Sequence, residues 1–387
     1  MSIERIGVIG AGVMGSEIAQ VAASSGRGVV MVDIDDAAVM RGMAHVRAIG
    51  ERRVARGRLT ADEAATISGR VAVAVDIDAI GDCDLIIEAG PEVLDLKLSL
   101  WRALDAAAPP SALLASNTSG LSITTLARAT NRPEQVMGLH FFNPASVMRL
   151  VEVIRGADTS DATLDAGVAI AQSFGKSPVR VVECPGFLVN RILVRALAEA
   201  YRHADELGVD RTAADASVVA HGPAPMGPFA LGDLIGLDTT LHVQRDLAAA
   251  YGTRFGAGTS LAAEVAAGRL GQKSGSGFVT DREAGTPDPD GVAIAERYYL
   301  GAFDEACRCL EEGIAALPDI DTAMQLGTGW SEGPLNWADS RGLAATADDL
   351  TRLATDAGDR FAPREPLRER AAAGTTFTHT ETKESPR

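Results

Sequence analysis

Lysine is scarce in this chain of 387 residues, and its four lysines stand at positions 97, 176, 273 and 383. Arginine therefore carries nearly all of the positive charge, and a lysine inside a motif stands out. Positive charge is also short overall, because 52 acidic residues outnumber 36 lysines and arginines and give a formal net charge of −16. A chain of that charge repels the phosphates of nucleic acid, so we expect no nucleic-acid partner.

Long apolar runs are absent as well. No stretch approaches the roughly 20 residues that a helix needs to cross a bilayer, so no membrane partner is expected. The first residues contain one acid and one base and lead directly into a strand, unlike a signal peptide, and the cytoplasm is the expected location. The four cysteines, at positions 83, 184, 307 and 309, show neither disulfide nor metal-ligand spacing. We interpret them as reduced packing residues and expect no bound metal.

The first half of the chain alternates short apolar strands with helical segments, which is typical of an α/β Rossmann-type, doubly wound, parallel sheet. Strands are expected at residues 5–9, 28–33, 71–75, 84–89, 112–116, 136–142, 150–154 and 179–183. Two polar helices are expected between about 36 and 68, with the helix-start signal LTADEA between them. From Pro185 onward the pattern is helical, and the Pro185-Gly186 turn indicates a hinge between domains.

The helical half contains an internal repeat. Five features recur at one offset of 106 residues: Glu199 as Glu305, Asp215 as Asp321, Gly227-Pro228 as Gly333-Pro334, Asp233 as Asp339, and Gly236-Leu237 as Gly342-Leu343. This regularity indicates a duplication of one helical unit. We therefore predict a Rossmann domain over 1–184, a first all-α copy over 185–280, a second copy over 281–372 and a polar, disordered tail over 373–387.

A dinucleotide fingerprint opens the chain. The glycines of its loop follow a strand and begin a helix, and Asp33 closes the next strand. The predicted cofactor loop consists of Gly10, Ala11, Gly12, Val13, Met14 and Gly15. Asp33 would accept hydrogen bonds from the adenosine ribose, and the acidic Asp35 and Asp36 beside it would repel a 2′-phosphate. The predicted cofactor is NAD rather than NADP; the alternative is a glycine-rich turn without a ligand.

Three polar residues of segment 112–156 lie at or near strands whose ends converge on the ligand crevice of such sheets. Ser119 follows one strand, His140 lies in the next strand motif and Glu152 lies in the strand beyond. Oxidation of an alcohol needs a base for the hydroxyl proton, and histidine titrates close to neutral pH. A neighbouring carboxylate would fix the imidazole tautomer and stabilise the imidazolium. Considered alone, His140 fits a hydrogen-bonded core histidine better.

Several motifs together resemble the 3-hydroxyacyl-CoA dehydrogenase family over about residues 3–280. They read IIEAGPEVLDLK, SNTSGLSI, GLHFFNP, LVEVI, PGFLVNR, GPAPMGPFALGDLIGLDTT and GQKSGSGF. The second repeat resembles the duplicated C-terminal domain of longer family members. The resemblance implies an NAD-dependent enzyme that oxidises the 3-hydroxyl of a (S)-3-hydroxyacyl-CoA, so the expected substrate is an acyl-CoA.

The resemblance also implies roles for individual residues. His140 would be the base and Glu152 its partner, while Ser119 and Asn190 would hydrogen-bond the substrate oxygen. Four further residues would contact or approach the cofactor: Glu92, Lys97, Asn143 and Lys273.

Local alternatives remain open for some of these residues. Lys97 also fits a solvated helix lysine, and Ser119 and Asn190 also fit turn or helix-capping residues. Arg56, within the basic cluster of residues 52–58, is the candidate for binding CoA, and a solvated helix face is its alternative.

Three substitutions depart from the family pattern. Glu17 stands where a small residue usually follows the glycine loop, and we expect it to alter only the helix surface. HFFNPASVMRL replaces the commoner HFFNPVPVMKL, so the loop beside the base has lost a proline. Gly90 stands where the family usually has an aliphatic residue, and both of these changes lie close to the expected position of the acyl group.

The second copy has Glu296 where the first has Asn190, so that copy is expected to be structural. It would bury the surface through which the family's helical domain dimerises, which leaves a monomer and a homodimer as alternatives.

Two other functions remain open. One is the same chemistry on a hydroxyacyl group carried by an acyl carrier protein in biosynthesis. The other is a non-catalytic, NAD-binding structural protein of the crystallin-like kind, against which the intact set of Ser119, His140, Glu152 and Asn190 argues.

Overall fold

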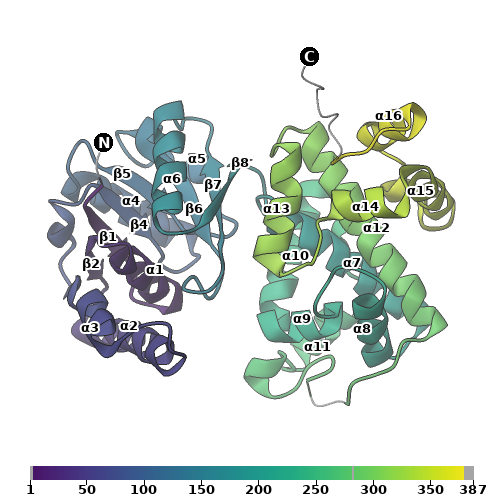
Figure 1. Ribbon diagram of the computed structural model, residues 1–387, viewed down its shortest axis with the longest axis horizontal. Coiled ribbons are helices and arrows are strands. Elements are labelled where there is room, and N and C mark those ends of the chain that lie inside the picture. Colours follow the sequence, from purple (N-terminus) through teal and green to yellow (C-terminus); the bar gives the residue numbers. More distant parts are fainter. Residues whose placement is uncertain (1–2, 281–282, 379–387) are drawn as a thin grey trace, which may run out of the picture. The chain divides into compact units, whose positions relative to one another are not determined.

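The computed structural model describes residues 3–280 and 283–378. The chain forms two compact units, Met1–Cys184 and Pro185–Arg387. The first contains a sheet flanked by helices, and the second is built of helices (Figure 1). All four cysteines are free thiols, and three of them are buried, in agreement with a packing role. In the parts of the chain that the structure describes, no helix combines the length and the apolar character that crossing a membrane requires.

The first unit is built around one eight-stranded sheet in the order β3-β2-β1-β4-β5-β6-β7-β8. Its strands are β1 (Arg5–Ile9), β2 (Gly28–Val32), β3 (Val71–Ala74), β4 (Leu85–Glu88), β5 (Leu113–Ser116), β6 (Val136–Phe141), β7 (Leu150–Arg155) and β8 (Ser177–Val182). These positions confirm the strands expected from the sequence, with ends that differ by two residues at most.

The predicted doubly wound sheet is confirmed and is mostly parallel, with one antiparallel pair that the sequence analysis did not predict. Strands β1 to β6 are parallel to their neighbours, whereas β7 pairs with β6 in the antiparallel sense and β8 runs parallel to β7. Residues 142–149 join β6 to β7 without a helix, and a parallel crossover needs a dozen residues or more. The chain therefore turns back, and His140 comes to lie directly opposite Glu152 in the β6–β7 register.

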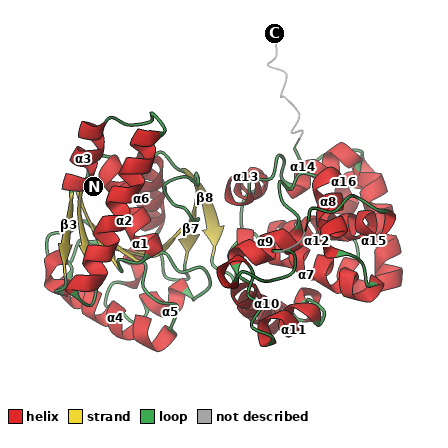
Figure 2. Cartoon of the chain, turned by 90° about the horizontal axis from the view of Figure 1, so that it is seen from below, coloured by secondary structure: helices red, strands yellow, loops and turns green. Residues whose placement is uncertain are grey.

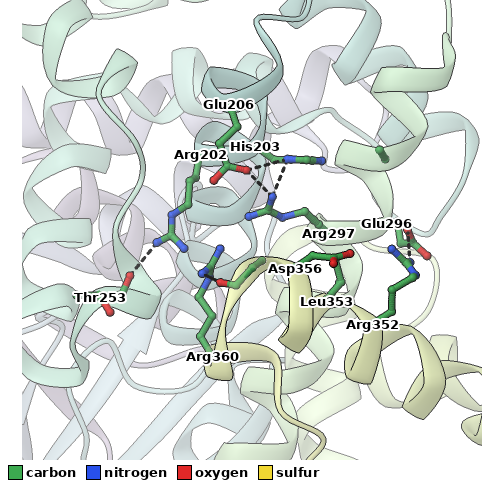
Figure 3. A pocket seen from close by; sticks show the side chains of 12 residues that line it. Arg202, His203, Glu206, Thr253, Glu296, Arg297, Arg352, Leu353, Asp356 and Arg360 are labelled. Atoms are coloured by element: carbon green, nitrogen blue, oxygen red, sulfur yellow. Dashed lines mark hydrogen bonds and ion pairs between the residues drawn. The ribbon is translucent and has the colours of Figure 1, made fainter.

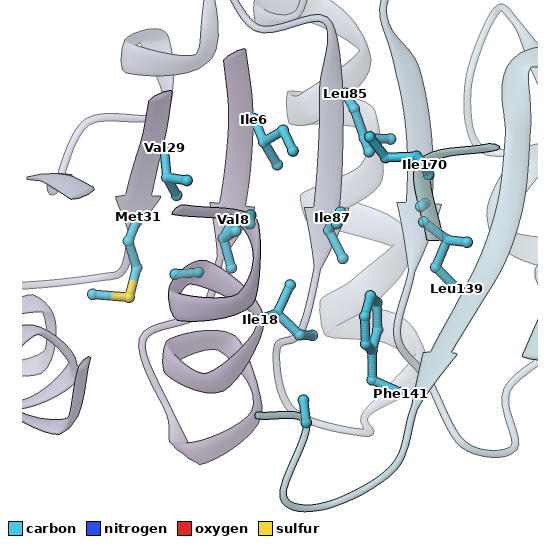
Figure 4. Close-up of a cluster of buried hydrophobic side chains, with 14 of the residues drawn as sticks. Ile6, Val8, Ile18, Val29, Met31, Leu85, Ile87, Leu139, Phe141 and Ile170 are labelled. Carbon is cyan, nitrogen blue, oxygen red and sulfur yellow. The ribbon is translucent and has the colours of Figure 1, made fainter. Parts of the chain in front are cut away.

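Helices lie on both sides of this sheet, with α1, α2 and α6 on one side and α4 and α5 on the other (Figure 2). They are α1 (Val13–Ser24), α2 (Asp36–Ala55), α3 (Ala61–Gly69), α4 (Leu94–Ala107), α5 (Ile123–Ala127) and α6 (Asp161–Ser173). Figure 4 shows the core, in which Ile18 of α1 and Ile170 of α6 meet the strand side chains. The expected start of α3 is confirmed, because Thr60 caps it in a capping box with Glu63.

The second unit contains the two helical copies. The first copy has α7 (Val189–Leu207), α8 (Arg211–Ala220), α9 (Pro228–Ile235), α10 (Leu237–Tyr251) and α11 (Ser260–Ala266); the second has α12 (Pro289–Glu311), α13 (Leu317–Thr328), α14 (Pro334–Arg341), α15 (Leu343–Ala357) and α16 (Glu365–Ala373). Equivalent aspartates play the same part in both copies. Asp215 accepts hydrogen bonds from two backbone amides at the start of α9, and Asp321 does so at the start of α14.

The end of the second copy corrects the prediction of a disordered tail from residue 373. Ala373 ends α16, and Phe377 is buried. The backbone amides of Phe377 and Thr378 donate to Asp339, as those of Phe278 and Val279 donate to its counterpart Asp233 in the first copy. The ordered copy thus reaches at least Thr378. The rest of the predicted tail, 379–387, and residues 281–282 at the start of the second copy lie outside the described residues.

The two copies join through a reciprocal exchange of buried ion pairs between α7 and α12. Arg191 of α7 binds Glu305 of α12 at 2.7 Å, and Arg297 of α12 binds Glu199 of α7 at 2.7 Å. Arg297 and Glu305 lie 106 residues after Arg191 and Glu199, so the two ion pairs are equivalent under the repeat. Two identical subunits make the same kind of exchange across a twofold axis.

Candidate active site

The glycine loop between β1 and α1 has the geometry that a pyrophosphate site needs. Gly10 has a φ of +101°, and a side chain there would lie 2.7 Å from the carbonyl oxygen of Ala89. Around a side chain placed on Gly12 there is open space. The first turn of α1 contains no acidic residue. The N-terminus of α1 therefore offers amide donors to an anion without a competing carboxylate.

Asp33 closes β2 and is tied to the same loop. Its Oδ2 accepts a hydrogen bond from the backbone amide of Ala11 at 2.6 Å, and its Oδ1 accepts one from Ile34 at 2.7 Å. A carboxylate has about four acceptor positions, so two remain for the ribose hydroxyls of a dinucleotide. Asp35 is the N-cap of α2, where it accepts from Ala38.

A buried carboxylate that sequence reasoning did not single out lies at the end of β4. Glu88 is fully buried and accepts hydrogen bonds from the Nζ of Lys97 at 2.6 Å, from the backbone amide of Gly90 at 2.6 Å and from the hydroxyl of Ser116 at 2.8 Å. Lys97 itself is only 1% exposed. The alternative of a solvated helix lysine is therefore wrong. Glu88 could have been found from the sequence, because it is an acidic residue at the end of an apolar strand.

Glu92 joins the loop after β4 to the loop after β5. Its carboxylate accepts from the hydroxyl of Thr118 at 2.9 Å and from the backbone amide of Ser119 at 2.8 Å, and it lies 3.5 Å from Lys97. Ser119 does not cap the helix that follows, since Ser122 is the N-cap of α5. Ser119 is thus held at the carboxyl edge of the sheet by a residue from the neighbouring strand's loop.

His140 and Glu152 form a buried pair on adjacent strands. The Nδ1 of His140 lies 2.6 Å from the Oε2 of Glu152, with His140 6% exposed and Glu152 fully buried. The register sets this distance because directly opposed side chains share one face of the sheet. Asn117, which sequence reasoning missed, ties the β5 loop to this strand by accepting a hydrogen bond from the backbone amide of Phe141 at 2.9 Å. Asn143, two residues further on, is exposed.

The remaining predicted residues lie in three other places. Asn190 is in the first turn of α7, whose N-cap is Leu188 and has no side-chain cap, so Asn190 does not cap that helix. Lys273, also in the second unit, forms an ion pair with Asp238. Arg56 is exposed at the C-terminal end of α2. A cavity of about 660 Å³ is lined by residues of α2, including Arg47, and of α3.

The expectation that Glu17 affects only a helix surface is wrong. Glu17 is 3% exposed, and its Oε2 accepts a hydrogen bond from the backbone amide of Ser146 at 2.8 Å. Ser146 is the position at which the loop after His140 has lost the family's proline, and a proline has no amide hydrogen to donate. The two departures from the family pattern therefore compensate each other, and together they tie the cofactor helix α1 to the loop beside His140.

Lys176 holds the same loop. Its ammonium donates to the carbonyl oxygens of Ala145 and Met148. Burial lowers the pKa of Lys176 to about 8, while the neighbouring Glu17 opposes that shift. Glu17 and Lys176 together thus bind three backbone groups of the loop between β6 and β7.

We expect Lys97→Met to lower the free energy of unfolding by about 3–5 kcal/mol, because it leaves the buried carboxylate of Glu88 without its cation. Urea denaturation of the full chain measures the change. Arg102→Met is the matched control, since Arg102 is exposed on the same helix, and it should change the free energy by less than about 0.5 kcal/mol. Equal effects of the two substitutions would contradict the assigned burial.

Ser146→Pro and Glu17→Ala should each lower stability by about 1.5–3 kcal/mol, because each removes the same hydrogen bond to a carboxylate. Their combination should cost little more than either change alone, which a double-mutant cycle measures. Ser146→Ala keeps the amide donor and is the control that should behave like the wild type. Full additivity of the first two substitutions would show that this hydrogen bond does not couple α1 to the loop.

Comparisons with known proteins agree with this fold. The family described as "3-hydroxyacyl-CoA dehydrogenase, NAD binding domain" matches residues 5–184. The family described as "3-hydroxyacyl-CoA dehydrogenase, C-terminal domain" matches residues 186–281 and again 294–383, once for each helical copy.

Individual relatives agree with these matches. The 3-hydroxyadipyl-CoA dehydrogenase of Escherichia coli (strain K12) is 32% identical over 465 residues, which cover 96% of this chain and 98% of that protein. The fatty acid oxidation complex subunit alpha of Idiomarina loihiensis is 35% identical over 408 residues, which cover 98% of this chain but only 56% of that subunit. This chain therefore spans little more than half the length of that relative.

A solved structure resembles the chain over nearly its whole length. The crystal structure of 3-hydroxybutyryl-CoA dehydrogenase from Escherichia coli K12 has a TM-score of 0.90 and 31% identity, and the match covers 96% of this chain and 99% of that one. The chain belongs to the 3-hydroxyacyl-CoA dehydrogenase family of NAD-dependent enzymes.

Proposed function

We propose that this chain catalyses the NAD-dependent interconversion of a (S)-3-hydroxyacyl-CoA and its 3-oxoacyl-CoA, with His140 as the general base. The observation that carries the proposal is the buried pair of His140 and Glu152, which lie 2.6 Å apart. Two strands, β4 and β5, separate the strand of His140 from β1, which leads into the glycine loop. With Nδ1 bound to the carboxylate, Nε2 is the nitrogen that would take the hydroxyl proton. Glu152 would stabilise the resulting imidazolium and hold the ring in place.

The other predicted residues would position the substrate oxygen and the cofactor. Ser119 and Asn190 would donate hydrogen bonds to the hydroxyl or carbonyl oxygen at C3. The backbone amides at the start of α1 would bind the pyrophosphate, and Asp33 would bind the adenosine ribose. Bound NAD supplies the acceptor for the hydride that leaves C3 as His140 takes the proton.

Four residues would complete the cofactor site. Glu92, which joins the loops after β4 and β5, and Lys97, which holds the loop after β4, would contact the ribose and pyrophosphate region of the cofactor. Asn143 follows the strand of His140 and is exposed, which suits a contact with the nicotinamide. Lys273 would reach the cofactor from the second unit.

Arg56 would contact the phosphates of CoA. It is exposed beside the other arginines of residues 52–58 in a chain with a strong negative net charge. Arginine suits this role because its planar group binds phosphate oxygens through two hydrogen bonds.

We also propose that the second helical copy takes the place of a partner chain. The reciprocal ion pairs of Arg191 with Glu305 and of Arg297 with Glu199 support this, since they are the contacts of a twofold dimer made within one chain. Glu296 at the position of Asn190 supports a structural rather than a catalytic second copy.

His140→Ala should lower kcat with acetoacetyl-CoA and NADH by on the order of 10²- to 10⁴-fold, the usual contribution of a general acid or base. Glu152→Gln should lower kcat as well while leaving the fold intact. NADH absorbance measures turnover. His242→Ala is the matched control, because His242 is 75% exposed, and it should retain wild-type kcat.

Both active-site variants must still unfold cooperatively and bind NADH, so that a loss of kcat reports on chemistry. Undiminished turnover by a folded His140→Ala variant would refute the proposed base. If the wild type reduced a 3-oxoacyl group on an acyl carrier protein but not the same group on CoA, the proposal of a CoA substrate would be overturned. The proposed mechanism would still stand.

Light scattering coupled to gel filtration should give the mass of one chain, because the interface that a partner would use is filled by the second copy. The measured mass should not change with protein concentration. A mass of two chains would show that the duplication does not replace the partner.

A further inference from the structure

A cavity of about 690 Å³ lies within the second unit, between the first and the second helical copy (Figure 3). Its walls come from α7, α12 and α15 and from the short turns at residues 253–255 and 359–361. The guanidinium groups of Arg202, Arg297 and Arg360 gather on one wall, and Arg352 lies with Glu296 on another (Figure 3). In a chain with a net charge of −16, four arginines around one cavity are exceptional.

The arginines outnumber the carboxylates that they bind. Four arginines converge on Glu199: Arg195 at 2.6 Å, Arg202 at 3.0 Å, Arg297 at 2.7 Å and Arg360 at 2.8 Å. Burial alone would raise the pKa of Glu199, but these arginines lower it to about 2, so the carboxylate stays ionised. Glu206, bound to Arg297 at 2.6 Å, is the second carboxylate of the cluster. Arg202, Arg297 and Arg360 line the cavity, whereas Arg195 does not.

Other charged groups line the cavity or lie beside it. Arg352 and Arg341 are matched by Glu296 and Asp349, to which they are bound. Among the lining residues, four arginines face three carboxylates, Glu206, Glu296 and Asp356. Burial, followed by the adjacent Arg297, lowers the pKa of His203, so this histidine adds no charge near neutral pH.

The internal repeat explains why a cavity exists here. The positions of Ala293 and Ala357 correspond, at the offset of 106 residues, to Phe187 and Tyr251 of the first copy. In the first copy the ring of Tyr251 covers the guanidinium of Arg191 at 4.2 Å. Alanine at 357 removes that ring from Arg297, the counterpart of Arg191. The cavity therefore lies where the second copy has lost two aromatic side chains.

We propose that this cavity binds the phosphate group of a small organic molecule. Arginine fits phosphate oxygens through paired, charge-assisted hydrogen bonds. The volume lies within the range of about 300–1,000 Å³ that is typical of small-molecule sites, which leaves room for more than a phosphate alone. Leu353 and Ala357 provide an apolar wall for the organic part. This site is additional to the NAD and acyl-CoA sites and does not depend on the assignment of His140.

Isothermal titration calorimetry of the full chain tests the proposal, with the cofactor site saturated by NADH and with inorganic phosphate and glycerol 3-phosphate as probes. Ala357→Tyr restores the ring of the first copy and should abolish binding by filling the cavity. Arg352→Ala should weaken binding about tenfold, as expected for one lost charge-assisted contact. Arg245→Ala, which removes an exposed arginine of the first copy, should bind like the wild type.

The two probes distinguish the sources of the phosphate group. Tighter binding of glycerol 3-phosphate supports a phosphate ester as the ligand, and binding of inorganic phosphate alone would restrict the site to the free ion. Because Arg352→Ala keeps the cavity open, it remains informative if Ala357→Tyr does not fold. Absence of millimolar binding by the wild type, or equal binding by Arg352→Ala and Arg245→Ala, would overturn the proposal.

Discussion

The antiparallel register of β6 and β7 is the constraint on which the active site depends. Leu139 and Val153 face each other in this register and belong to the hydrophobic core on one side of the sheet. His140 and Glu152, one residue further along each strand, therefore point to the opposite side together. A slip of one residue would turn a buried carboxylate toward the apolar core, which costs several kcal/mol for an unpaired charge. Hydrophobic burial on one face of the sheet thus enforces the pairing of His140 with Glu152 on the other face.

Carboxylates from neighbouring segments fix the loops that surround this pair. Asp33 holds the glycine loop, Glu88 holds the turn after its own strand, and Glu92 holds the loop that carries Ser119. Glu17 adds a link from α1 to the loop that follows His140. The contacts of Asp33, Glu92 and Glu17 join segments 22 to 129 residues apart in the chain, so the positions of the glycine loop and of His140 depend on one another. Such prior ordering lowers the entropic cost of bringing hydride donor and acceptor together.

Local patterns made most of the fold predictable, because strands, capping boxes and glycine turns are specified within a few residues. The antiparallel direction of β7 was not predicted. The rule that alternating strands and helices form a parallel sheet was applied to the β6–β7 connection, which is too short to contain a helix. The burial of Lys97 and Glu17 could not be inferred from their own helices, since their partners come from other elements. Ser146 lies 129 residues from Glu17, and a loop amide carries no sequence signal as a donor. The tail was predicted to be disordered because its composition is polar. The backbone amide of Phe377 nevertheless donates to an aspartate, as that of Phe278 does in the first copy.

The duplication also explains where the second copy has diverged. The two copies share the aspartates that anchor their helices and the arginine–glutamate exchange that joins them, because both copies need these contacts to form one packed unit. A copy without a substrate is not required to keep the side chains that a substrate would meet. The differences that matter here occur around the counterpart of Asn190, and they replace Phe187 by Ala293, Asn190 by Glu296, Asp246 by Arg352 and Tyr251 by Ala357. The same divergence that replaced Asn190 by a glutamate therefore opened the cavity and changed the charge of its wall.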